Sequence, residues 1–442
     1  MIGTLVILTT DLVVGAALLR LLQIATRTRA SAAAIAFGLG HFTVFYVHLV
    51  AAIVGMPLGR VSVVSTCAAL SLLAIVAARS RGERPALAPV RAPRGWPEWA
   101  IVAAIVLAFV VMLGSIAVLP VRGFDTRMIW AFHADLIYNA GTYPPPLLKD
   151  PAFVVGHPQY PPGIPLVSAL AAFVDGAWDD RVAAVIPALF YPAIVALIAA
   201  ELVHRDDRWG WYLCGAFALL PMLTTKIHGG ADSGYVDLVV AFYVLVAAIL
   251  VLSRDRPASF GSAAAAGIAA AGAATTKNEG MLLAVMVCAA VWLRGSLRRR
   301  AALTMTVTTI ALVAPWKWVQ AGLAGVFEER YGEFLTLDRL LWGLGRAGDV
   351  AVDMLRVLFL TVTTTGVVWW IVLGWWVASG QKREVLSVRA LWIVPAYFAI
   401  AFVLYLITPW AGIDQVHTSF DRLSLHVAPL ALWAVAGPAR DG

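Results

Sequence analysis

The sequence contains few charged residues, and this scarcity excludes most soluble folds. Asp, Glu, Lys and Arg make up 13% of the 442 residues, whereas hydrophobic residues make up 61%. A soluble domain is about a quarter charged, so a water-facing surface cannot accommodate this many apolar side chains. The composition therefore predicts a protein that is dissolved in a lipid bilayer.

Other missing features narrow the function. The three cysteines, Cys67, Cys214 and Cys288, all lie in apolar runs without metal-ligand spacing. No glycine-rich phosphate loop between a strand and a helix is evident, which argues against a nucleotide-sugar fold. The formal net charge is +7, but no basic element is interleaved with exposed aromatic residues. We therefore expect no nucleic acid partner.

The apolar runs, rich in Ala, Leu and Val, predict helices rather than a membrane barrel, because a helix satisfies its own backbone hydrogen bonds in hydrocarbon. We expect an all-α polytopic membrane protein with about 13 transmembrane helices. Residues 1–95 are predicted to form three leading accessory helices, and residues 96–442 the main domain with a large polar loop at 120–181. The expected spans begin near Thr4, Ala33, Val61, Glu98, Val182, Gly210, Asp237, Ser259, Gly280, Ala301, Ala351, Ala390 and Asp421.

Basic residues gather in one set of short connections, which the positive-inside rule assigns to the cytoplasm. The N-terminus is then outside and the C-terminus cytoplasmic. Most Asp, Glu and His fall in the opposite, outer regions at 122–181, 226–236, 276–280, 320–349 and 408–420. We therefore expect the active face to be extracytoplasmic. The basic residues that set this topology are Arg27, Arg29, Arg79, Arg81, Arg84, Arg91, Arg94, Arg205, Arg208, Arg254, Arg256, Arg294, Arg298, Arg299, Arg300, Lys382, Arg383, Arg389 and Arg440.

The first outer loop begins with an acid and an amphipathic segment. After Asp125, apolar residues recur at helical spacing, which predicts a helix lying on the membrane interface. Asp125 has two interpretations: an N-cap of that helix, or an acid fixed at the mouth of a cavity. Further along, Pro144 to Pro146 predict polyproline II, and the prolines of the segment His157–Pro162 are expected to hold His157 and Tyr160 in one extended stretch.

Five short motifs occur in this order in the outer regions, and together they resemble the GT-C superfamily of integral membrane glycosyltransferases. The similarity is to the bacterial branch related to protein O-mannosyltransferases and lipid A aminoarabinose transferases, and it covers roughly residues 111–438. Three helices precede the span that leads to Asp125, where the family usually has none, so the role of residues 1–95 stays open. The motifs are Gly123-Phe124-Asp125 with Trp130, His157-Pro158-Gln159-Tyr160-Pro161-Pro162, Gly234-Tyr235-Val236-Asp237, Thr276-Lys277-Asn278-Glu279-Gly280 and Thr418-Ser419-Phe420-Asp421-Arg422.

The resemblance implies transfer of a sugar, with inversion, from a polyprenyl-phosphate-linked donor to a glycan, lipid or protein acceptor on the outer face of a bacterial inner (plasma) membrane. Asp125 matches the general base. Cations would neutralise the leaving phosphate: Lys277 and Arg422, with Lys226 and His228 as a weaker pair. Contacts to sugar or acceptor would come from His157, Tyr160, Asp237, Glu279 and Trp130. Simpler interpretations stay open: snorkelling for the cations, and helix-dipole compensation for Asp237 and Glu279.

No obligatory cofactor is expected. Asp125, His157 and Asp237 offer three ligands to a divalent metal, but nothing in the sequence brings them together. The main rival function is a secondary transporter or flippase of a lipid-linked or small polar substrate, which predicts ionisable residues near mid-membrane. Asp11 and Asp353 are the exceptions inside the apolar runs, and each is placed near a span end. A non-catalytic scaffold would not need so many acids on one face.

Overall fold

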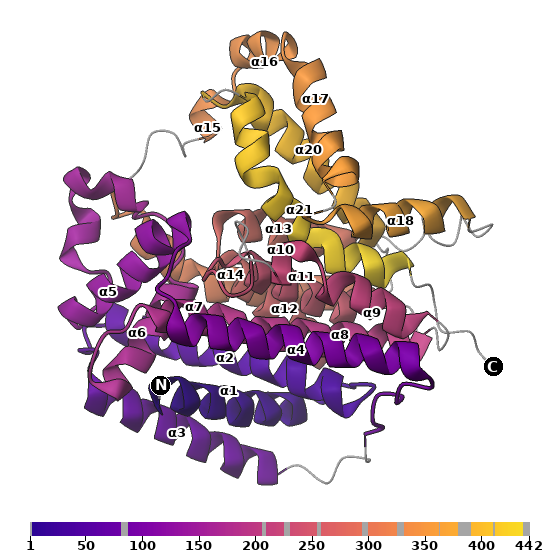
Figure 1. Cartoon of the computed structure of the whole chain (residues 1–442). Coiled ribbons are helices and arrows are strands. Elements are labelled where there is room, and N and C mark those ends of the chain that lie inside the picture. Colours follow the sequence, from indigo (N-terminus) through magenta and orange to yellow (C-terminus); the bar gives the residue numbers. More distant parts are fainter. Residues whose placement is uncertain are drawn as a thin grey trace.

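The computed structural model describes residues 2–80, 87–205, 209–224, 230–253, 258–293, 299–324, 331–361, 363–378, 390–409 and 412–435 (Figure 1). Within these ranges every extended regular element is helical, and the only β-type pairing is an isolated bridge between Thr28 and Ala88. The prediction of an all-α protein is confirmed.

In the described residues, six stretches of helix are long and apolar enough to cross a bilayer. They contain 20 to 25 residues, and at about 1.5 Å per residue each spans the roughly 30 Å hydrocarbon core. By helix length and hydropathy the chain is a multi-pass membrane protein. The six are α1 (Ile2–Leu21), α2 (Arg29–Ile53), α3 (Arg60–Arg79), α4 (Trp96–Val118), the stretch Arg181–Val203 in α7 (Arg181–Ala188) and α8 (Phe190–Arg205), and α14 (Arg299–Gln320).

The remaining helices are shorter or more polar, so the expected 13 spans are not all present as long apolar helices in the described residues. Apolar helices below 18 residues, or with only a short apolar part, are α6 (Gly163–Asp175), α11 (Asp237–Leu252), α12 (Phe260–Ala274), α13 (Asn278–Trp292), α18 (Gly366–Ala378) and α20 (Ala390–Ile407). The others are η1 (Thr126–Trp130), α5 (Ala131–Ala140), η2 (Pro146–Lys149), η3 (Pro151–Gly156), α9 (Gly210–Ala218), α10 (Pro221–Thr224), α15 (Tyr331–Phe334), α16 (Leu337–Leu344), α17 (Ala347–Leu355), η6 (Arg356–Leu360) and α21 (Gly412–Val435).

Three of the expected spans differ from the described helices. The span predicted from Ala351 is interrupted, because α17 and η6 together end at Leu360 and α18 begins only at Gly366. The span predicted from Gly210 ends after nine residues in α9, because Pro221 has no amide hydrogen and disfavours helical dihedrals at the residue before it. The sequence predicts that the last span begins near Asp421, yet α21 already begins at Gly412. The motif at Thr418–Arg422 therefore lies within a helix, where its side chains are held on a helical repeat.

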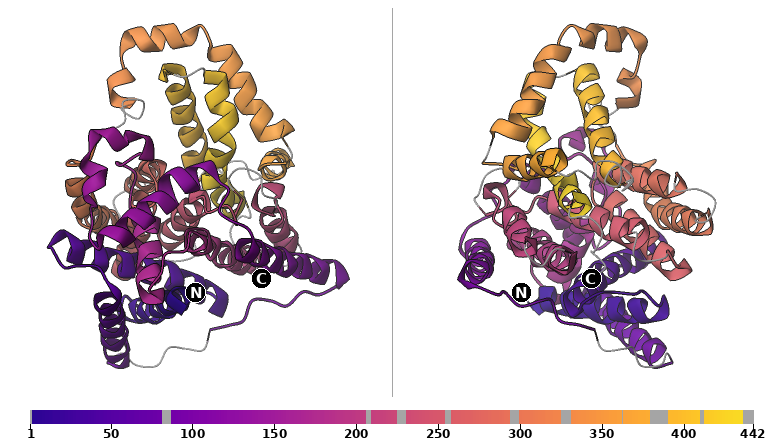
Figure 2. Two further views of the ribbon diagram at one scale, coloured as in Figure 1. Left: turned by 60° about the vertical axis from the view of Figure 1, so that its left-hand side comes forward. Right: turned by 90° about the vertical axis from the view of Figure 1, so that its right-hand side faces the viewer.

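The three leading helices pack against one another along one edge of the molecule, in indigo and violet (Figures 1 and 2). Glycines allow α1 and α2 to touch through their backbones: a Cβ on Gly15 would lie 1.7 Å from the Ala36 carbonyl oxygen, and one on Gly40 would lie 1.7 Å from the Asp11 carbonyl oxygen. Small residues of this kind are typical of helix pairs in membranes.

The orange and yellow C-terminal helices α16, α17, α20 and the first part of α21 project away from the leading helices in both figures. The later part of α21 returns to pack on α11. α20 packs against α13, and the candidate site lies at that junction, where the end of α14 and part of α21 also line the cavity.

The first loop contains the expected helix, formed by η1 continuing into α5, with Ile129 and Trp130 buried. Of the two predictions about its prolines, the polyproline II prediction holds at Pro145 but not at Pro146, and the second prediction is wrong. Pro145 has polyproline II dihedral angles (φ −59°, ψ 142°), but a 3₁₀ turn begins at the next residue. His157 adopts a left-handed conformation with φ 52° and its carbonyl accepts from the Tyr160 amide at 2.9 Å. His157 and Tyr160 therefore flank a tight turn, not an extended stretch.

Candidate active site

A cavity of about 630 Å³ lies where the first loop, α13, α14, α20 and α21 meet. Five segments that are distant in the sequence contribute to its wall, and most of its polar groups come from the predicted motifs. Its lining residues are Asp125, Gln159, Tyr160, Lys277, Asn278, Glu279, Leu282, Lys317, Gln320, Ala321, Ala401, Leu404, Tyr405, Gln415, Ser419, Arg422 and Leu423.

Asp125 is paired with Arg422 across the wall of this cavity. Its own dihedral angles are already helical (φ −60°, ψ −35°) and its side chain caps no amide, so the N-cap interpretation is wrong. Instead, Arg422 Nη1 donates to Asp125 Oδ2 at 2.5 Å. The carboxylate side chain stays 25% exposed and borders the cavity, so a substrate hydroxyl can reach it.

Tyr235 packs against this pair. The Arg422 guanidinium lies 4.9 Å from the centroid of its ring, a cation–π geometry, and the Tyr235 hydroxyl accepts from the Asp125 amide at 3.4 Å. The loop that carries Tyr235 is fixed because Thr126 Oγ1 donates to the Ser233 carbonyl at 2.7 Å. Gly234 completes the contact: its φ is +78°, and a Cβ there would lie 2.4 Å from Thr126 Cγ2.

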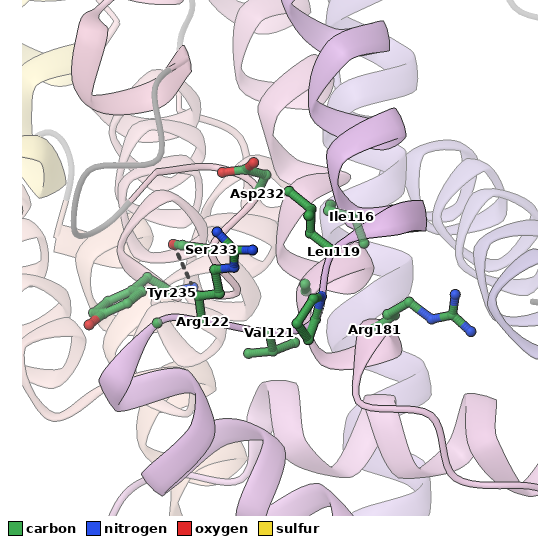
Figure 3. A pocket seen from close by; sticks show the side chains of 11 residues that line it. Ile116, Leu119, Val121, Arg122, Arg181, Asp232, Ser233 and Tyr235 are labelled. Atoms are coloured by element: carbon green, nitrogen blue, oxygen red, sulfur yellow. Dashed lines mark hydrogen bonds between the residues drawn. The ribbon is translucent and has the colours of Figure 1, made fainter.

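A smaller hollow of about 170 Å³ lies beside Tyr235. Figure 3 shows Arg122 and Asp232 near Ser233 and Tyr235, whereas the Arg181 side chain points away from them. Arg181 is instead bound to Asp179, with Nη2 and Oδ2 2.5 Å apart.

Lys277 and Asp237 form a second, more deeply buried pair. Lys277 Nζ lies 2.8 Å from Asp237 Oδ1 and 3.4 Å from Glu279 Oε1. The Lys277 side chain is 6% exposed and that of Asp237 1%, so Lys277 does not snorkel to the surface. Asp237 is the first residue of α11, where it suits the helix dipole, but its oxygen also binds Lys277. Lys277 borders the cavity and Asp237 lies behind it.

His426 is a site residue that the sequence reasoning missed. Its Nε2 is 2.8 Å from Asp237 Oδ1, and its Nδ1 is 2.9 Å from the Tyr397 hydroxyl. The partners fit a neutral ring in which Nε2–H donates to the carboxylate and Nδ1 accepts from the tyrosine. His426 follows Arg422 by one helical turn, so the spacing of four residues was an available signal.

Three ring side chains of the first two motifs contact one another edge to face. Tyr160 borders the cavity, while Trp130 and His157 meet its ring edge-on with centroids 5.3 and 5.5 Å away. Trp130 is only 1% exposed and His157 is not part of the cavity wall. Neither residue lines the cavity; both pack against Tyr160, and their contact with a sugar stays a prediction.

His133 holds the turn at His157–Tyr160 in place through a hydrogen bond. Its Nε2–H donates to the Gly156 carbonyl at 2.7 Å, immediately before His157. The pKa of His133 is lowered to about 4, mainly because the ring is buried; the hydrogen bond to the Gly156 carbonyl opposes this shift and the neighbouring His157 adds to it. The ring is therefore neutral at physiological pH, with the proton on Nε2 that the hydrogen bond to Gly156 uses.

The three ligands considered for a metal do not converge. Asp125 is bound to Arg422 and Asp237 to Lys277 and His426, and no group of three His, Cys, Asp or Glu residues in the described ranges is arranged to hold a metal ion. Lys226 and His228 lie outside the described residues.

Asp11 occupies a different place from the predicted one. It lies at the middle of α1, not near a span end, and its Oδ2 is 2.9 Å from His41 Nδ1 on α2. Both side chains are almost fully buried, at 1% and 5% exposed, and neither borders the two cavities above.

Comparison with known proteins gives no independent indication of function. No family model matches the chain, and no curated protein or solved structure is similar enough to count as a match.

Proposed function

We propose that the protein is a membrane glycosyltransferase that moves a sugar, with inversion, from a polyprenyl-phosphate-linked donor to an extracytoplasmic glycan, lipid or protein acceptor. The observation that supports this proposal is the convergence of Asp125, Tyr160, Lys277, Glu279 and Arg422 on one cavity. These residues come from four of the five motifs, and the arginine distribution assigns all of them to the same side of the membrane.

The residues of the cavity suit a single displacement. Asp125 takes the proton from an acceptor hydroxyl as that oxygen bonds to the anomeric carbon. The bond from the anomeric carbon to the phosphate oxygen breaks on the opposite side, and polyprenyl phosphate leaves with one additional negative charge. Lysine and arginine side chains around the cavity stabilise that charge. Arg422 also fixes the direction in which the Asp125 carboxylate points.

The remaining wall suits a sugar and a lipid tail. The amide side chains of Gln159, Asn278, Gln320 and Gln415 can donate to and accept from sugar hydroxyls. Leu404 and Leu423 add apolar surface. A donor anchored in the bilayer has its phosphate at the membrane interface, so it reaches such a cavity by lateral diffusion.

The test is a transfer assay in nanodiscs with a radiolabelled polyprenyl-phosphate sugar and a cell-envelope fraction as the source of acceptor. We expect wild-type protein to release polyprenyl phosphate and label the acceptor, and Asp125→Asn to do neither. Asp135→Asn is a matched control, because Asp135 bonds to Asn139 on the exposed side of α5. Equal transfer by wild type and Asp125→Asn would overturn the assignment of the base.

One observation favours a second candidate, a transporter or flippase. The Asp11–His41 pair lies at the centre of two candidate spans, where ionisable residues often mark transport pathways. Movement of a labelled donor across proteoliposomes without transfer of its sugar would favour this candidate. Transfer that needs donor on only one side of the bilayer would favour the glycosyltransferase.

A further inference from the structure

The two cations that were expected to bind the donor phosphate already have carboxylate partners. Lys277 is 2.8 Å from Asp237 and 3.4 Å from Glu279, and Arg422 is 2.5 Å from Asp125. A phosphate that approached either cation would meet the negative charge of its partner as well. These pairs therefore leave little net positive charge for a ligand.

Lys317 differs from both. It borders the same cavity from α14, and its one hydrogen-bond partner in the described part of the chain is the neutral amide oxygen of Gln320. An ammonium group has three donors, so Lys317 can add a phosphate oxygen without breaking an ion pair. Gln320 is itself held, because its Nε2 donates to the Gln159 carbonyl at 2.7 Å.

Lys317 also lies at a suitable depth. It is in the last turn of the 22-residue helix α14, whose other end begins at Arg299. Trp316 and Trp318 flank it, and Trp318 is 72% exposed. Tryptophan is enriched where the hydrocarbon core meets the lipid headgroups, so Lys317 is at the level where lipid phosphates reside.

We propose that Lys317 is the principal binding residue for the phosphate of the lipid-linked donor and of the polyprenyl phosphate product. This inference rests on the proposed function and concerns the same cavity. It places the phosphate against α14 and the sugar between Lys317 and Asp125. Arg422 and Lys277 then hold the carboxylates of Asp125 and Asp237 in place, and Lys317 is the main ligand of the phosphate.

The experiment measures binding of a fluorescent polyprenyl monophosphate to the full-length protein in nanodiscs of zwitterionic lipid. Removing a hydrogen bond to a charged group costs about 1.5–3 kcal/mol, so Lys317→Gln should weaken binding by roughly 10- to 100-fold. Lys317→Arg keeps the charge and should stay within about threefold of wild type. Lys149→Gln is the control, since Lys149 is exposed outside the cavity wall and should bind as wild type does.

Competition separates the possible sources of the phosphate signal. Unlabelled polyprenyl phosphate should displace the probe, whereas inorganic phosphate or polyprenol at the same concentration should not, because the lipid tail and the charge are both needed. If inorganic phosphate displaces it equally well, the site is a general anion site and the lipid assignment is wrong. If wild type binds the probe and Lys317→Gln binds it equally tightly, the Lys317 assignment is wrong. If wild type binds no probe at all, the proposed function itself fails.

Discussion

Two regions of this protein each hold a carboxylate paired with a nitrogen base, and they differ in what lies beside the pair. In the leading helices, Asp11 and His41 are enclosed between α1 and α2, which touch through their backbones at Gly15 and Gly40. At the cavity, Asp125 and Arg422 keep 25% and 13% of their side chains exposed and border about 630 Å³ of space.

The comparison shows that burying a charge in a membrane protein does not by itself make a site. Asp11 Oδ1 and His41 Nε2 have no hydrogen-bond partner in the described residues, so burying these two polar side chains costs free energy. The hydrogen bond that the structure shows for them is the one they make with each other. Such a pair can fix the register of two helices. The Asp125 pair has room for a ligand beside it, and we interpret that room as the mark of function.

Replacing each acid by its amide should produce the largest contrast. General-base catalysis contributes roughly 10²- to 10⁴-fold in rate, so Asp125→Asn should lower the turnover number by that factor while the protein remains folded. Asp11→Asn should leave the turnover of the folded protein within about threefold, because Asp11 touches no part of the cavity. Transfer assays normalised to the amount of folded protein compare the two turnover numbers. A large loss of turnover in Asp11→Asn, with none in Asp125→Asn, would contradict this assignment of roles.

The leading pair should instead control stability. Removing one member of a buried pair costs about 3–5 kcal/mol, whereas replacing both by apolar residues is often nearly neutral. Asp11→Leu or His41→Phe alone should therefore lower the free energy of unfolding by about that amount, and the double variant should recover most of it. Unfolding in mixed micelles gives the free energies of wild type, the two single variants and the double variant, which together form a double-mutant cycle. Additive losses in the double variant would show that the pair is not coupled.

His133 should make stability depend on pH. Its pKa is about 4 in the folded protein and near 6.5 when solvated, so below pH 6.5 the unfolded chain binds a proton that the folded chain does not. Stability should fall as the pH drops from 6.5 to 4, by about 3 kcal/mol in total, and this term should level off below pH 4. His133→Gln, which can still donate to the Gly156 carbonyl, should lose this part of the slope. An unchanged slope would contradict the burial of a neutral ring.

The smallest expected effect is at His426. Gln in its place can donate one hydrogen bond to Asp237, so His426→Gln should weaken binding of polyprenyl phosphate by only about threefold, while His426→Phe leaves Asp237 short of a donor and should cost about tenfold. Isothermal titration calorimetry or the fluorescence binding assay measures the dissociation constant of each variant and distinguishes the two. Equal effects would mean that the ring acts through its size and not through its hydrogen bonds.

The local features of the fold could be predicted from the sequence. Apolar length identified all six long helices, and the helical spacing after Asp125 identified η1 and α5. The arginine distribution grouped the motif ends that meet at the cavity. These signals are contained within single segments, or depend on charge sums that need no tertiary structure.

The pairings within the site could not be predicted in the same way. Asp125 and Arg422 are 297 residues apart, and a capping preference at Asp125 gave no hint that its partner was an arginine. Lys317 belongs to none of the five motifs, and its position in the last turn of α14 is one that basic residues commonly take. His426 was treated as part of an apolar span, because its contact with Asp237 depends on how α21 packs on α11. Tertiary packing, absent from local patterns, decided these roles.

The most direct test of the account is a structure of the protein in nanodiscs with polyprenyl phosphate bound. We predict phosphate density in the cavity within hydrogen-bonding distance of Lys317, with the Asp125 carboxylate facing the space that a sugar would fill. Lipid density that leaves this cavity empty, or that runs past Asp11 and His41 through the leading helices, would contradict it.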